Sequence, residues 1–88
     1  MIPVKDAVGR AVQFARTVLE PSRTPDLLLE EVEPATIDGK EVWLITLSMP
    51  SQASLGNLTG ARDYKTFTLD GQTGEPISMK IREVVGAR

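Results

Sequence analysis

The clearest pattern in the chain is an apolar stripe over residues 3–20, which predicts an amphipathic helix. Apolar residues recur there at three- and four-residue steps, the spacing that places side chains on one face of a helix. Pro3 suits the start of this helix, and Pro21 ends it because its ring pushes the preceding residue out of the helical region. Phe14 lies beside the stripe and is expected to cap one edge of the core. The stripe consists of Val4, Ala7, Val8, Ala11, Val12, Ala15, Val18 and Leu19.

Four strands are predicted after the helix, at residues 27–33, 41–49, 62–70 and 76–85. The Asp38-Gly39 pair is a strong hairpin signal between the first two strands. Residues 50–61 are rich in small and polar residues and predict a long hairpin loop before the third strand. This order predicts an α+β domain over residues 1–88, in which one N-terminal helix packs on a four-stranded antiparallel meander.

Alternation within the strands predicts which side chains face the helix. In the first strand, Leu28 and Val32 are expected to point inward. The other strands give longer inward rows: Trp43, Ile45, Leu47 and Met49, then Phe67 and Leu69, then Ile77, Met79 and Ile81. Tyr64, Thr66 and Thr68 are expected on the opposite side of the sheet.

The turn between the last two strands, residues 70–75, is unusually well specified. Asp70 can accept hydrogen bonds from backbone N–H groups two or three residues later, and Thr73 can add a second local bond. Gly71 and Gly74 are both expected to supply a positive φ.

Composition argues against an enzyme. The chain has no histidine and no cysteine, which removes the usual general base, the thiol nucleophile and the commonest metal ligands. Ser48, Ser51 and Ser54 have no residue at a recognisable spacing to activate them. We therefore expect no catalytic residue, no metal site and no cofactor.

Charge is concentrated in residues 26–41, which contain six acids and one base. This acidic segment should repel nucleic acid, and the apolar runs are too short for a membrane span. The first residues lack the apolar run of a secretory signal, so we expect a cytoplasmic protein. A periplasmic or secreted protein whose signal has been removed would show the same pattern.

A helix, then strands, then Asp-x-x-Thr-Gly-Glu at residues 70–75 resembles the PepSY domain family. The match also includes Tyr64-Lys65-x-Phe67 in the preceding strand, whereas Pro76 stands where such sequences more often have an aliphatic residue. The resemblance implies a cystatin-like architecture and a role in inhibiting or regulating peptidases.

The favoured function is a non-enzymatic protein-binding or regulatory module. Tyr64, on the side of the sheet opposite the helix, is a candidate contact residue, and Gln52 lies in a loop that loosely resembles the peptidase-binding hairpin of cystatins. Glu30, Glu31 and Glu33 form an acidic run that suits either a solvated edge strand or a basic partner. In the second case the chain would act as an immunity- or antitoxin-like protein that neutralises this partner through residues 26–41.

Calcium binding by the same three acids is disfavoured, because neighbouring residues of a strand point to opposite faces. A homodimer is also expected. The sheet face opposite the helix would carry Val42, Leu44, Tyr64 and Val84, which is more apolar surface than a small monomer usually exposes. A second copy of the chain or the 50–61 loop would then cover it.

Overall fold

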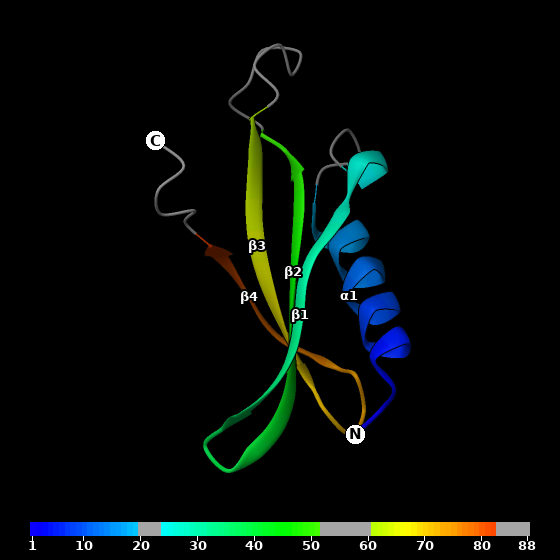
Figure 1. The fold of residues 1–88 in the computed structure, drawn as a ribbon. Helices are drawn as coiled ribbons and strands as arrows, with labels where there is room; N and C mark the ends of the chain where they lie inside the picture. The colour runs from blue at the N-terminus through cyan, green and yellow to red at the C-terminus, as the bar shows by residue number, and fades with distance from the viewer. Residues whose placement is uncertain (20–23, 52–60, 83–88) are drawn as a thin grey trace.

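The computed structural model describes residues 1–19, 24–51 and 61–82, and it places a helix along one face of a strongly twisted sheet (Figure 1). The sheet order is β1-β2-β3-β4, and each neighbouring pair is antiparallel. This is the predicted α+β meander, and it is consistent with a cystatin-like fold. The elements are α1 (Val4–Val18), a 3-10 turn η1 (Thr24–Asp26), β1 (Leu28–Ile37), β2 (Lys40–Pro50), β3 (Arg62–Asp70) and β4 (Pro76–Arg82).

Helix α1 packs closely on the sheet because the centre of its stripe consists of alanines. Ala7, Ala11 and Ala15 are fully buried. Phe14 packs its ring edge-to-face against Phe67 of β3, with 6.0 Å between the ring centroids, so it caps the core as predicted. With the three alanines, the buried cluster consists of Ile45, Leu47 and Met49 of β2 and of Phe67 and Leu69 of β3.

No helix among the described residues is long and apolar enough to cross a membrane.

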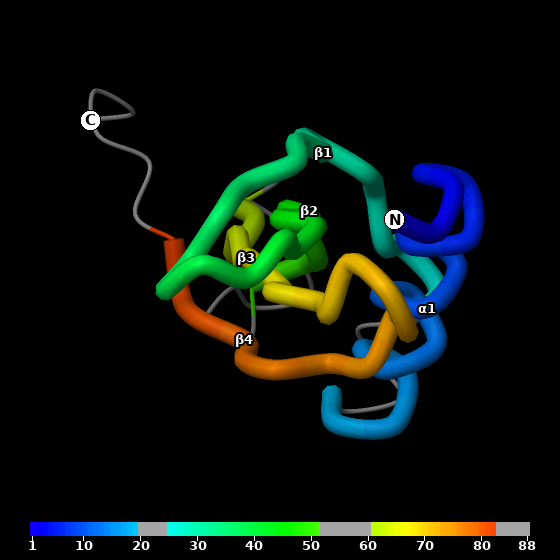
Figure 2. Tube along the Cα trace, turned by 90° about the horizontal axis from the view of Figure 1, so that it is seen from below, coloured from blue at the N-terminus to red at the C-terminus, as the bar shows by residue number. Residues whose placement is uncertain are grey.

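Strand β4 departs from the predicted inward row. It starts beside α1, and the twist of the sheet carries it away from the helix (Figure 2). Ile81 is consequently 77% exposed, and Ile77 and Met79 are also exposed. Ile77 is in addition an extra residue in the β3–β4 pairing, between the pairs Leu69–Pro76 and Thr68–Ser78. Met79 and Ile81 lie on the helix side as predicted, since they pair with Phe67 and Lys65, but neither is buried there. The predicted inward position of Ile77 is wrong, because this extra residue lies on the opposite side of the sheet.

Strand β1 contains a second irregularity, which changes the side of the sheet that its first residues face. Leu29 pairs with Leu47 and Glu31 with Thr46, so Glu30 is an extra, bulged residue. Val32, after the bulge, packs against the core as predicted. Leu28, before the bulge, lies opposite Ser48 and is 51% exposed, so its predicted inward position is wrong.

The predicted turns form with the expected chemistry, apart from one glycine. Asp38 and Gly39 both have positive φ, 52° and 79°, as a tight hairpin requires. In the 70–75 turn, Asp70 Oδ1 accepts hydrogen bonds from the N–H groups of Gln72 (2.7 Å) and Thr73 (3.2 Å). Thr73 Oγ1 accepts a third, from the Glu75 N–H.

Gly74 has the expected positive φ, 78°, but Gly71 does not. Gly71 is instead required because the turn approaches β2 closely. A Cβ at this position would lie 2.7 Å from the Glu41 carbonyl oxygen, which accepts the Gly71 N–H at 3.0 Å.

The same turn holds the N-terminal residues against the sheet. The Ile2 N–H donates to the Gly71 carbonyl (2.7 Å), and Trp43 Nε1–H donates to the Ile2 carbonyl (3.0 Å). Asp70 Oδ2 also forms an ion pair with Lys40 Nζ at 2.7 Å. The bond to Lys40 and the Gln72 and Thr73 N–H groups lower the pKa of Asp70 below its ordinary value of 3.8.

Candidate functional site

The candidate site is the side of the sheet opposite α1, which we call the open face. It carries the side chains that alternate with the core residues along each strand. Three polar residues on this face are buried even though the helix lies on the other side: Thr46, Ser48 and Thr68. Longer polar side chains from neighbouring strands cover Thr46 and Ser48, in two clusters.

The central cluster joins the two edge strands across the open face. Arg82, from β4, forms an ion pair with Glu31, from β1. Edge strands of a four-stranded sheet are three strand spacings apart, roughly 14 Å, so both side chains must extend over the middle strands. Beneath them, Arg82 Nη1 donates to Thr46 Oγ1 at 3.3 Å, and Thr46 Oγ1 lies 2.9 Å from Thr66 Oγ1.

The second cluster is centred on Ser48, which is fully buried. Its hydroxyl donates to Glu30 Oε2 at 2.7 Å and accepts from Arg62 Nε at 2.9 Å. Arg62 Nη2 also donates to the Ser48 carbonyl at 3.0 Å and to the Asp26 carbonyl in η1. This arginine therefore ties η1 to β2 and holds the serine hydroxyl in one orientation.

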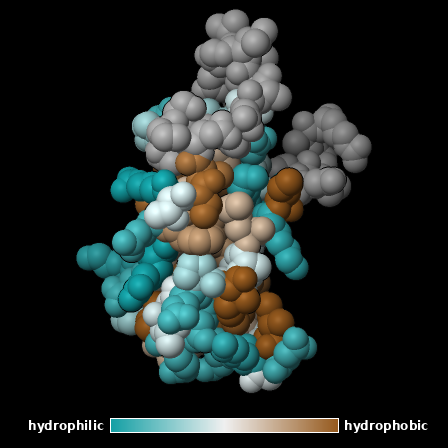
Figure 3. Space-filling model, turned by 180° about the vertical axis from the view of Figure 1, so that it is seen from behind, coloured by the Kyte–Doolittle hydropathy of each residue, from teal (hydrophilic) through white to brown (hydrophobic). Residues whose placement is uncertain are grey.

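The hairpin end of the open face carries apolar side chains beside charged ones such as Lys40 and Lys80. Val42 forms the floor of a shallow groove there and is only 1% exposed, while Ile37 and Ile77 line it and are exposed. On the side of the molecule shown in Figure 3, hydrophobic residues lie in small groups separated by hydrophilic residues.

Four of the five residues selected from the sequence lie on this face. Glu31 and Glu33 pair with Thr46 and Leu44, and Tyr64 pairs with Ser48. The bulge turns Glu30 toward the open face as well, where it meets Ser48. Gln52 lies outside the described residues.

The bulge corrects one argument made from the sequence. Glu30 and Glu31 do not point to opposite faces, so strand alternation does not keep their carboxylates apart. They are instead engaged by Ser48 and by Arg82, respectively. Among the described residues there is no group of three or more histidine, cysteine, aspartate or glutamate side chains placed to hold a metal ion.

The expectation of an apolar open face is also corrected. Val42 is buried, and Leu44 and Tyr64 are half-buried; Val84 lies outside the described residues. The centre of the face consists of hydroxyl, guanidinium and carboxylate groups. The homodimer stays a prediction, because exposed apolar side chains remain at the hairpin end of this face.

Sequence reasoning missed Arg62, Arg82 and the two buried hydroxyls of Thr46 and Ser48. A usable signal was present, because all four alternate with core residues along their strands. Alternation does not predict which neighbouring strand the side chain of each arginine reaches.

The Ser48 hydroxyl is enclosed by the groups that it bonds. Ser48 Oγ contacts a carboxylate and a guanidinium, and it is fully buried beneath them. The face can donate and accept hydrogen bonds at fixed positions, which suits recognition.

Comparisons with protein-family models, with curated proteins and with solved structures gave no match to this chain.

Proposed function

We propose that this chain is a non-enzymatic protein-binding module and that the open face is its binding surface. The observation that carries the proposal is the ordered polar row from Glu31 to Arg82, on the face of the sheet opposite α1. Groups that are already held in one geometry lose little conformational entropy on binding. Tyr64 adds a half-buried aromatic ring with a polar tip on the same face, a residue type enriched at binding hot spots.

A more specific version of this proposal is that the bound protein is a peptidase, which the chain regulates. It is supported by the resemblance of residues 64–75 to the PepSY family and by the helix-on-meander architecture. Its test is a panel of purified peptidases assayed with and without an excess of the chain. Inhibition or activation that is saturable would support this form.

An immunity- or antitoxin-like role through residues 26–41 is the alternative. The position of Glu30, Glu31 and Glu33 on one face favours it, because three clustered acids attract a basic partner. The charge that they present is reduced, however, since Arg82 pairs with Glu31 and Arg62 shares Ser48 with Glu30. We therefore place it second.

The experiment is affinity capture from the native host with three baits. These are the wild-type chain, Glu33→Lys on the open face, and Glu75→Lys on the β3–β4 turn, which makes the same charge change at an exposed position elsewhere. A partner held by the wild type and by Glu75→Lys but lost by Glu33→Lys supports the open face. A partner held equally by all three baits places binding elsewhere.

Two further measurements test the functional class. The purified chain is expected to show no turnover of ester, peptide or phosphate substrates above blank; a reproducible activity abolished by one substitution would contradict the non-enzyme proposal. Sedimentation equilibrium at micromolar concentration tests whether the partner is a second copy, since a homodimer gives twice the monomer mass.

A further inference from the structure

The two edges of the sheet differ in how easily they could accept another strand. β1 and β4 are the outer strands, and an outer strand has one row of backbone groups that its own sheet does not pair. Such rows are the usual place where an extended segment of a partner adds to a sheet.

The β1 edge is obstructed in several ways. Glu30 bulges out of the ladder near its start, and Pro34 lies near its centre and has no N–H to donate. Bulges and prolines both discourage strand addition. Glu33 and Glu30 also give this strand an acidic character.

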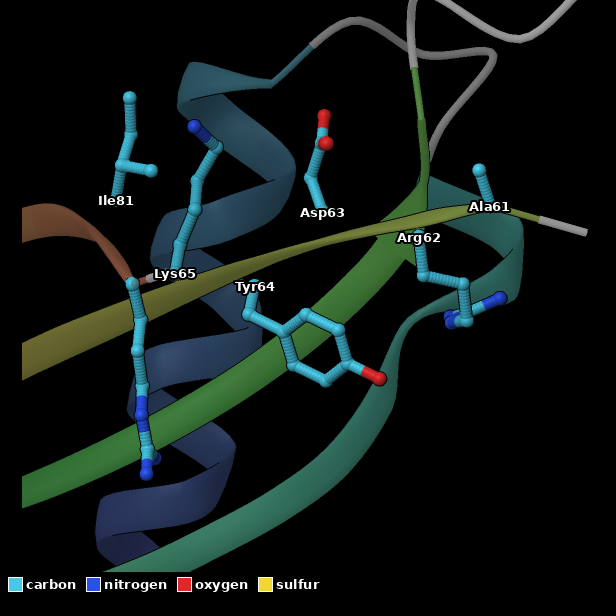
Figure 4. Close-up of a pocket in the computed structure, with 7 residues that line it drawn as sticks. Ala61, Arg62, Asp63, Tyr64, Lys65 and Ile81 are labelled. Atoms are coloured by element: carbon cyan, nitrogen blue, oxygen red, sulfur yellow. The ribbon is translucent and has the colours of Figure 1, made fainter. Parts of the chain in front are cut away.

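The β4 edge is regular over its last five residues. Beyond the extra residue Ile77, Ser78 through Arg82 pair one-to-one with β3. Met79 and Ile81 lie on the helix side of the sheet and are exposed there, Ile81 more than any other large apolar side chain among the described residues. In Figure 4, Ile81 and Lys65 project to one side of the sheet, and Tyr64 and Arg62 project to the other.

The charge of the β4 edge favours an acidic segment of a partner over a second copy of the chain. Residues 76–82 contain two bases, Lys80 and Arg82, and no acid. Arg82 is paired with Glu31, so Lys80 dominates the charge that an added strand would meet. A second copy pairing through its own β4 would bring basic side chains together across the new ladder, and like charges facing each other in a sheet are destabilising.

We propose that the β4 edge binds an extended segment of a partner protein in which acidic and apolar residues alternate. The segment adds as a fifth strand beside residues 78–82. One of its acids meets Lys80 on the open-face side, and its apolar residues cover Met79 and Ile81 on the helix side. This inference rests on the proposed protein-binding function and specifies the partner's chemistry at a second surface.

The test uses two blocked synthetic peptides with the full chain. One alternates valine with glutamate, and the matched control has lysine in place of every glutamate. Amide hydrogen exchange of the chain is followed by NMR while each peptide is titrated. The glutamate peptide should slow the exchange of amides within residues 78–82, and the lysine peptide should not.

A charge reversal at Lys80 distinguishes specific recognition of the peptide from nonspecific binding. Lys80→Glu should weaken binding of the glutamate peptide by about threefold to tenfold and improve binding of the lysine peptide. Lys5→Glu, which makes the same charge change at an exposed position on α1, should leave both affinities unchanged.

The proposal is overturned by equal binding of both peptides, by protection confined to β1 or the open face, or by no protection at saturation. It is also overturned if sedimentation of the chain alone shows a dimer that Lys80→Glu strengthens, because a second copy would then be the occupant. Partner capture that survives in any of these cases leaves the protein-binding function intact, so the two failures are distinguishable.

Discussion

Gly71→Ala tests the close approach between the β3–β4 turn and β2. The added methyl group would lie 2.7 Å from the Glu41 carbonyl oxygen, well inside the 3.4 Å at which ordinary contacts begin. The obstacle is backbone, so no side-chain rotation relieves it, and the turn must move away from β2. That movement stretches the Gly71 N–H bond to Glu41 and the Ile2 N–H bond to Gly71.

The expected loss of stability follows from these two effects. Overpacking of this kind costs about 1–3 kcal/mol, and a weakened buried hydrogen bond adds about 1 kcal/mol. Gly71→Ala should therefore lower the free energy of unfolding by roughly 2–4 kcal/mol. At about 4–8 °C per kcal/mol for a domain of this size, the melting temperature should fall by at least 8 °C or so.

Urea denaturation is the direct assay, with Trp43 as the fluorescent probe, because it is the sole tryptophan and its indole N–H bonds to Ile2. Gly9→Ala is the matched control. A Cβ at Gly9 meets nothing within 4 Å, and replacing a mid-helix glycine should stabilise the chain by about 1 kcal/mol. A Gly71→Ala midpoint and slope equal to those of the wild type would refute the close approach.

Three further outcomes are expected. The lowered pKa of Asp70, caused first by Lys40, means that the unfolded chain takes up a proton before the folded chain does. Stability should therefore decline as the pH falls below about 4, and this decline should be shallower in Asp70→Asn, as seen in melts over a pH series. Ser48→Ala should cost about 1–2 kcal/mol in urea denaturation, because two charged groups lose their shared hydroxyl. A double-mutant cycle of Glu31→Gln and Arg82→Met should give a coupling of about 0.2–1 kcal/mol that shrinks with added salt, since the pair is partly exposed.

For each of these three predictions, a specific result would contradict it. Parallel pH curves for wild type and Asp70→Asn would remove the contribution of that carboxylate. An unchanged midpoint for Ser48→Ala would mean that the buried hydroxyl adds nothing to stability. Additive effects in the cycle would mean that the ion pair across the open face does not form in solution.

The architecture could be predicted from the sequence because its signals are local. The alanine stripe, the Asp38-Gly39 turn and the alternation around Trp43 each depend on residues close together in the chain. The 70–75 turn was predictable for the same reason, since the hydrogen bonds of Asp70 and Thr73 span only two or three residues.

The errors came from irregularities that leave no compositional trace. Glu30 and Ile77 look like ordinary strand residues, yet each is the extra residue of a bulge, and Leu28 was misplaced as a result. The exposure of Ile81 depends on the twist of the whole sheet. The ion pair between Glu31 and Arg82 joins residues 51 positions apart, and no local pattern selects that pair over others.

The two bulges also determine where the length of this chain can change. Removing Glu30 would join the pairs Leu29–Leu47 and Glu31–Thr46 directly, and removing Ile77 would do the same for the pairs on either side of it. A single-residue deletion elsewhere inside β1 would instead shift the residues on one side of the deletion by one position and turn all of their side chains to the wrong face. Deletions fixed during evolution, or selected from a library of shortened chains, should therefore concentrate at these two positions within the strands.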